Sequence, residues 1–110
     1  MNYLQSVAKR VREEIAPNLR PKTRSEELYR VYALLALVRG RQCTLENVHD
    51  AWSVWMTGDQ PDHDALVPFN LLSPEAQLKD APYLAAIKRV ATHLPRGPIG
   101  APDGSKGSDA

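Results

Sequence analysis

The apolar pattern of residues 24–39 limits the fold more than any other stretch of this sequence. At least seven large apolar side chains fall within these sixteen residues. At helical spacing they cover too wide a surface to face a single neighbour. We therefore expect this stretch to be the central helix of the fold, covered on more than one side. Its apolar residues are Leu28, Val31, Tyr32, Leu34, Leu35, Leu37 and Val38.

Local signals predict where this central helix begins and ends. Thr23, followed three residues later by Glu26, is a capping-box pattern typical of a helix N-terminus. Gly40 can take the left-handed conformation that stops a helix. Arg39 and Arg41 would then lie near the negative end of the helix dipole.

Three further main helices complete the predicted bundle, over residues 2–16, 45–56 and 82–93. A short helix should begin at the Ser-Pro-Glu signature of residues 73–75. No stretch alternates like a strand, so we predict an all-α domain of four main helices. The predicted inward faces are Tyr3, Leu4, Val7, Val11 and Ile15, then Leu45, Val48, Trp52 and Trp55 or Met56, and finally Leu84, Ile87, Val90, Ala91 and Leu94.

The remaining segments are predicted to be a connector and a tail. Residues 58–77 begin with turn-forming residues and continue with apolar ones, so this proline-containing connector should cross the core. Residues 95–110 hold four of the six glycines and three of the nine prolines, which favours a flexible tail. We expect one helical domain over residues 1–94, because a chain of 110 residues has room for a single core.

Composition argues against several classes of protein. The single cysteine, Cys43, cannot form an internal disulfide or supply a four-ligand zinc site, which favours a cytoplasmic protein. Residues 1–14 become charged before any apolar run long enough for an export signal. The longest apolar run, residues 32–38, is far too short to cross a bilayer. We expect neither an export signal nor a membrane anchor.

Charge is distributed unevenly along the chain. Residues 1–42 carry nine Lys or Arg against four Asp or Glu, whereas residues 43–94 carry three against seven. Solvated helix surface is the favoured interpretation, because nucleic-acid binders usually show a denser basic stripe. Nucleic-acid binding, if it occurred, would weaken steeply with salt. Its candidate residues are Arg20, Lys22, Arg24, Arg39 and Arg41.

No pattern of catalytic or metal-ligating residues is specific. The Asp-His-Asp run at residues 62–64 sits in a predicted loop without a second histidine at helical spacing, so we expect no metal site. His49 and Asp50 are neighbours on a helix and point about 100° apart, so they do not form a catalytic pair. No base is placed to activate a nucleophile, and no glycine-rich phosphate loop is present. We expect no enzymatic activity and no cofactor.

The stretch ENVHDAW at residues 46–52 gathers polar and aromatic groups on one helix. The favoured interpretation is structural, because Trp52 and Trp55 are three residues apart and share a helical face, which is more often core than ligand site. The alternative is a ligand site, because an aromatic wall with a few directed polar groups suits a planar small molecule. That site would use Asn47, His49, Asp50, Trp52 and Phe69.

ENVHDAW, followed after a gap by LVPFNLLSPEAQLKD, resembles the small helical repeat of ryanodine receptors and its stand-alone bacterial and phage relatives. The stretch between the two blocks is shorter here and lacks that family's Gly-Trp-x-Tyr-Gly segment. Over its whole length the chain is similar to an uncharacterised family of short helical proteins from actinobacteria and their phages. The matching positions are Glu46, Asn47, His49, Asp50 and Trp52, then Leu66, Val67, Pro68, Phe69 and Leu72.

The resemblance implies a compact helical recognition module and, in some receptor-type relatives, a site for an adenine-like ligand between repeats. It also favours a structural role for ENVHDAW, in which Trp52 anchors the core while Asn47, His49 or Asp50 bond to the LVPF connector. Our leading functional hypothesis is a small non-enzymatic module, in the cytoplasm of a bacterium or of a phage's host, that recognises a protein partner. A sensor or sponge for a nucleotide-like ligand is the alternative, and weak nucleic-acid binding is a third. The wide apolar surface of residues 24–39 would also suit a homodimer.

Overall fold

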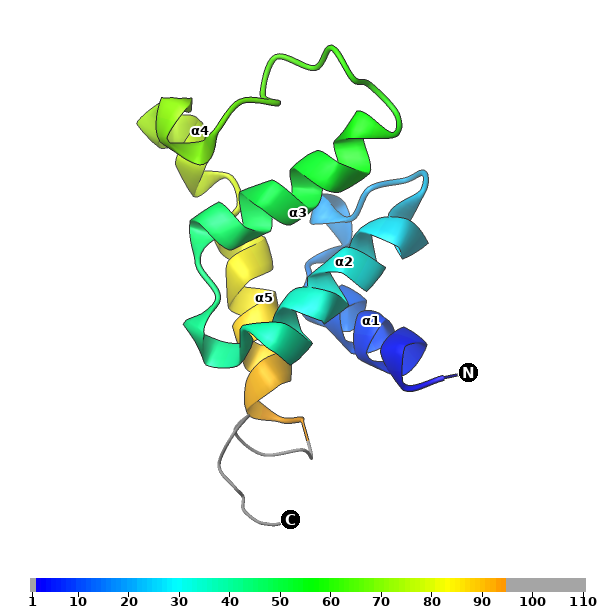
Figure 1. The fold of residues 1–110 in the computed structure, drawn as a ribbon. Coiled ribbons are helices and arrows are strands. Elements are labelled where there is room, and N and C mark those ends of the chain that lie inside the picture. The colour runs from blue at the N-terminus through cyan, green and yellow to red at the C-terminus, as the bar shows by residue number, and fades with distance from the viewer. Residues whose placement is uncertain (1, 95–110) are drawn as a thin grey trace.

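The computed structural model describes residues 2–94, which form a helical bundle (Figure 1). The four long helices are α1 (Tyr3–Glu14), α2 (Ser25–Val38), α3 (Leu45–Thr57) and α5 (Ala81–Thr92). Between them lie the five-residue helix α4 (Pro74–Leu78) and the 3-10 turns η1 (Pro17–Leu19), η2 (Gly40–Gln42) and η3 (Phe69–Leu71). The predicted all-α fold with four main helices is confirmed, and these residues contain no strand. The predicted tail, residues 95–110, lies outside the described residues.

Helix α2 is the centre of the bundle, as its sequence predicts. It packs against α1, α3 and α5. Leu34 and Val38 were expected to belong to its packed surface, but both are more than half exposed. The helix is therefore covered on two sides and open on a third, which holds these two residues. Its buried residues are Leu28, Tyr29, Tyr32, Ala33, Ala36 and Leu37.

The inward face of α1 is confirmed except at its first residue. Val7, Val11 and Ile15 are buried in the core, and Leu4 packs against it. Tyr3 was predicted to face inward and is largely exposed. The buried strip of α1 is centred near the direction of Leu4, and Tyr3 points about 100° away from Leu4, so Tyr3 falls outside that strip.

Several helix boundaries follow the predicted local signals. Gly40 follows α2 with a φ of 59°, the left-handed conformation that glycine adopts at lowest cost. Thr44 caps α3, since its Oγ1 accepts a hydrogen bond from the Asn47 N–H at 3.1 Å. Ser73 caps α4 in the same way, accepting from the Ala76 N–H at 3.2 Å. None of these helices is long and apolar enough to span a membrane, among the residues described.

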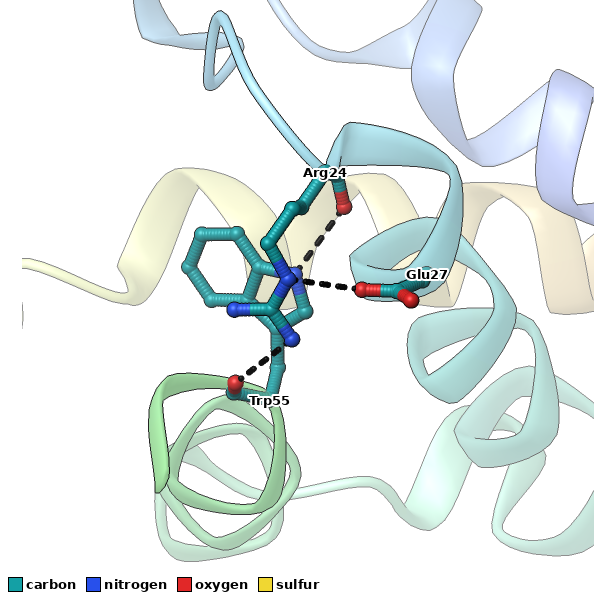
Figure 2. Close-up of polar contacts among 3 residues, drawn as sticks. All are labelled: Arg24, Glu27 and Trp55. Atoms are coloured by element: carbon teal, nitrogen blue, oxygen red, sulfur yellow. Dashed lines mark hydrogen bonds and ion pairs between the residues drawn. The ribbon is translucent and has the colours of Figure 1, made fainter. Parts of the chain in front are cut away.

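The start of α2 differs from the prediction. Its N-cap residue is Arg24, with a φ of 54°, and no side chain caps the helix, so the predicted Thr23–Glu26 capping box is wrong. Arg24 instead contacts the far end of α3 (Figure 2). Its Nη2 donates to the Trp55 carbonyl oxygen at 3.2 Å, and its guanidinium lies 5.2 Å from the Trp55 ring centroid. The Trp55 indole Nε1 donates back to the Arg24 carbonyl oxygen at 3.0 Å.

These contacts form a two-way link, the Arg24–Trp55 clamp, between the start of α2 and the end of α3. Arg24 Nε also donates to Glu27 Oε1 at 2.8 Å, which orients the guanidinium over the ring. A left-handed backbone costs a non-glycine residue roughly 1–2 kcal/mol. The contacts of the clamp offset that cost and explain why this residue need not be glycine.

Replacing Trp55 with phenylalanine should weaken the clamp without removing the aromatic ring. The Arg24 carbonyl oxygen loses its donor, so we expect the free energy of unfolding to fall by about 1–2 kcal/mol. Urea denaturation would measure the change. The matched control is Val54→Ala, on the exposed side of the same helix, which should cost less than about 0.5 kcal/mol. Equal effects of the two substitutions would show that the clamp adds nothing to stability.

Candidate functional site

The predicted site centres on His49, which α3 holds beneath the connector. His49 was expected to lie beside the apolar strip of α3, but it is 3% exposed and faces inward beside Val48. Its Nε2 lies 2.7 Å from the Val67 carbonyl oxygen. A carbonyl oxygen only accepts, so Nε2 must carry the proton and donate it. This bond ties ENVHDAW to LVPF, as the structural interpretation of the sequence predicts.

Three aromatic side chains gather around His49 or its neighbour Trp52 and complete what we call the His49 cluster. The Trp52 ring stacks on His49, with centroids 5.8 Å apart and planes inclined by 22°. Phe69, at the start of η3, lies 6.1 Å from the His49 centroid. His63 approaches the Trp52 ring edge-on at 5.2 Å. Trp52, His63 and Phe69 are each partly exposed, so the cluster reaches the surface.

The connector follows a different path from the one predicted. It was expected to cross the core, yet none of residues 58–73 belongs to the buried core. His49 occupies the inward position of α3, and the connector contributes His63 and Phe69 to the cluster from outside the buried core. Figure 1 shows this loop arching away from the bundle before it returns to α4.

The other two predicted site residues lie apart from the cluster. Asn47 belongs to the N-terminal cap of α3, where its Oδ1 accepts from the Thr44 N–H at 3.0 Å and from Arg39 Nε at 3.1 Å. Asp50 is exposed on the outer side of α3. The structure therefore brings together His49, Trp52 and Phe69, whereas Asn47 serves the helix start and Asp50 faces solvent.

The predicted nucleic-acid residues do not form one stripe. Arg20 Nε donates to carbonyl oxygens at the end of α1, at 2.9 Å for Ile15. Arg24 belongs to the clamp at the start of α2, whereas Arg39 and Arg41 follow its end. The 14 residues of α2 separate these two groups by roughly 21 Å at 1.5 Å per residue. Lys22 is exposed before α2. Nucleic-acid binding through these residues stays a prediction.

Comparison with known protein families identifies the family of this chain. A family described as a domain of unknown function, DUF7701, matches residues 2–92. The chain belongs to this family. No curated protein and no solved structure matches it. Membership of DUF7701 agrees with the uncharacterised helical family expected from the sequence.

The structure of this DUF7701 domain adds Asp80, which sequence reasoning missed, to the surroundings of the His49 cluster. Burial raises the pKa of the Asp80 carboxyl, and the charge of His49 opposes that shift. Burial also raises the pKa of Tyr32 and of Tyr83, and the negative charge of Asp80 adds to both shifts. The available signal was the position of Asp80 just before Ala81–Pro82, where a helix begins, although its side chain does not cap α5.

His63 also has a local role that its sequence did not indicate. Its Nδ1 accepts a hydrogen bond from the Ala65 N–H at 3.0 Å, which closes the turn after the Asp-His-Asp run. No group of three or more histidine, cysteine or acidic side chains that could hold a metal ion lies within residues 2–94 of the DUF7701 domain. The edge-on contact of the His63 ring with Trp52 therefore helps to position the connector.

Replacing His49 should loosen the connector from α3. His49→Ala removes the donor to Val67 and most of a buried ring, so we expect the free energy of unfolding to fall by about 2–4 kcal/mol. His49→Gln keeps an N–H donor near the Nε2 position and should lose about half as much. Urea denaturation of both variants measures the difference. His93→Ala, at an exposed histidine after α5, is the matched control. If alanine and glutamine cost the same, the hydrogen bond to Val67 is not what holds the connector.

Proposed function

We propose that this chain is a small non-enzymatic binding module that docks a protein partner through residues 67–78. The observation that carries the proposal is a set of exposed apolar side chains on this short segment. Val67, Leu71 and Leu78 are 36%, 69% and 62% exposed. Apolar groups gathered at a surface favour a partner that buries them, at about 25 cal/mol per Å².

Hydrogen bonds hold this docking segment in shape before any partner arrives. His49 donates to the Val67 carbonyl oxygen, and Gln77 Nε2 donates to the carbonyl oxygens of Phe69 and Leu72 at 3.1 and 3.3 Å. A segment that is ordered in advance loses less conformational entropy on binding. Figure 1 shows α4 set apart from α1 and α2, where a partner can approach it.

The sequence resemblances extend this proposal to a cellular location and a kind of organism. We propose that the module works in the cytoplasm as an accessory protein of an actinobacterium or of its phage. Its ENVHDAW and LVPF blocks support a relationship to the ryanodine-receptor repeat, a compact recognition unit. The exposed Leu34 and Val38 of α2 support a separate proposal, that a second copy of the chain binds at α2 to form a homodimer.

A photo-crosslinking amino acid placed at residue 71 tests the docking segment in cells that encode the chain. We expect one specific protein adduct from residue 71 and none from the control position 13, which is exposed on α1. Leu78→Asp should weaken partner binding at least tenfold, since a buried leucine contributes roughly 1.5–3 kcal/mol. The same products from both positions would contradict the proposal. Sedimentation of the purified chain tests the separate proposal of a homodimer.

The His49 cluster supports a second proposal, a sensor or sponge for a nucleotide-like ligand. Trp52 stacks on His49, meets His63 edge-on and is partly exposed, so its accessible part gives a planar base an aromatic surface to contact. Asn47 and Asp50 lie apart from the cluster, so His49, Trp52 and Phe69 alone carry this second proposal.

Thermal shift with adenosine, which has no phosphate, tests this second proposal on the full chain. A ligand that binds the folded state should raise the melting temperature by about 6–11 °C at ten times its dissociation constant. Trp52→Leu should abolish the rise, and Val54→Leu, on the exposed side of the same helix, should keep it. No rise up to millimolar adenosine, on a chain that melts cooperatively, rules out this ligand class.

A further inference from the structure

A groove of about 590 Å³ lies between α1 and α2, away from both the docking segment and the His49 cluster. Four residues from each helix line it, and they include Lys9 and Arg12 of α1 and Arg30 of α2. The only acidic residue in the lining is Glu26. Three cations against one carboxylate leave the groove with two net positive charges.

The three cations are free to bind a ligand. Lys9, Arg12 and Arg30 make no salt bridge with any residue in the described part of the chain. Some basic side chains elsewhere do bond to other residues: Arg24 donates a hydrogen bond to the Trp55 carbonyl oxygen, and Arg89 forms a salt bridge with Glu14. Unpaired cations that share one concave surface favour an anionic ligand.

The buried residue Tyr29 also lines the groove. Tyr29 is 2% exposed, and its hydroxyl has no hydrogen-bond partner among residues 2–94. Such a group costs free energy unless something binds it. Burial raises the pKa of Tyr29, and the positive charges of Arg20 and Arg12 oppose that shift. The phenol therefore keeps its proton at neutral pH and can donate a hydrogen bond.

The first turn of α2 also borders the groove. Ser25 and Glu26 line it and are the first two residues of α2, whose start has no side-chain cap. The first N–H groups of a helix lack partners within the helix and point toward its N-terminal end, where anions are stabilised. The sequence predicted a capping box here, and the structure leaves these donors available.

We propose that the α1–α2 groove binds a small molecule that carries a phosphate group. Lys9, Arg12 and Arg30 neutralise its charge, while the Tyr29 hydroxyl and the first N–H groups of α2 donate hydrogen bonds. The volume lies within the 300–1,000 Å³ typical of small-molecule sites. A small ligand is favoured over nucleic acid because the cations converge in one groove instead of forming a stripe. The proposal does not depend on the docking segment.

An NMR titration of the full chain tests the groove, with inorganic phosphate, ribose 5-phosphate and adenosine 5′-monophosphate as probes at constant ionic strength. We expect saturable shifts of the backbone amides at the start of α2 and along the facing side of α1. Tighter binding of either ester than of inorganic phosphate identifies the part of the ligand beyond the phosphate. Adenosine without phosphate should leave these amides unshifted.

Substitutions can distinguish binding in the groove from nonspecific electrostatic attraction between the protein and an anion. Lys9→Gln with Arg12→Gln should raise the dissociation constant at least tenfold. The matched control, Arg41→Gln with Lys79→Gln, removes the same charge from exposed positions outside the groove and should change it less than threefold. Tyr29→Phe removes only the hydroxyl, so it should weaken binding about three- to tenfold and leave the melting temperature unchanged or higher.

Two results would overturn the proposal. One is a set of shifts that grows without saturation and is equal in the groove and control variants, because that is nonspecific screening of surface charge. The other is binding of duplex DNA that weakens steeply with salt while the phosphate probes do not bind, because the basic half would then recognise nucleic acid.

Discussion

Burial of α2 on two sides is the constraint on which the rest of the fold depends. Tyr32, at its centre, is fully buried, and its ring lies 5.9 Å from that of Tyr83 on α5. Helix α1 covers one side of α2, and α3 and α5 cover another. The Arg24–Trp55 clamp fixes the direction of α2 against α3. The loops need only connect helices whose places are already set by this packing.

The second constraint on the structure is His49, a histidine at an inward-facing position of α3. An aliphatic residue there would pack as well and would leave the Val67 carbonyl oxygen without its donor. Buried polar pairs of this kind contribute modestly to stability, because desolvation cancels much of the gain. Their larger effect is to select one arrangement. His49 selects the path of the connector and thereby fixes where Phe69 and the docking segment lie.

The sequence predicted the features that depend on local spacing. Gly40, Thr44 and Ser73 act through residues at most four positions away, so their patterns are readable along the chain. The predicted start of α2 was wrong because Arg24 is held in place by Trp55, 31 residues later in the chain. No local sequence pattern contains that contact. Asp80 was missed for the same reason, since its surroundings come from α2, α3 and α5. The bond between His49 and the connector was predicted because both blocks recur together in the resembling repeat.

The polar groups of ENVHDAW show why motif and function need not coincide. Asn47 is engaged by the cap of α3, and His49 by Val67, so the structure already uses their hydrogen-bonding capacity. Binding free energy must come from groups that folding leaves unsatisfied. In residues 2–94 such groups include the exposed apolar side chains of the docking segment and, among the residues that line the α1–α2 groove, the unpaired cations and the Tyr29 hydroxyl. Neither set stands out as a motif, because each is defined by contacts that folding does not make.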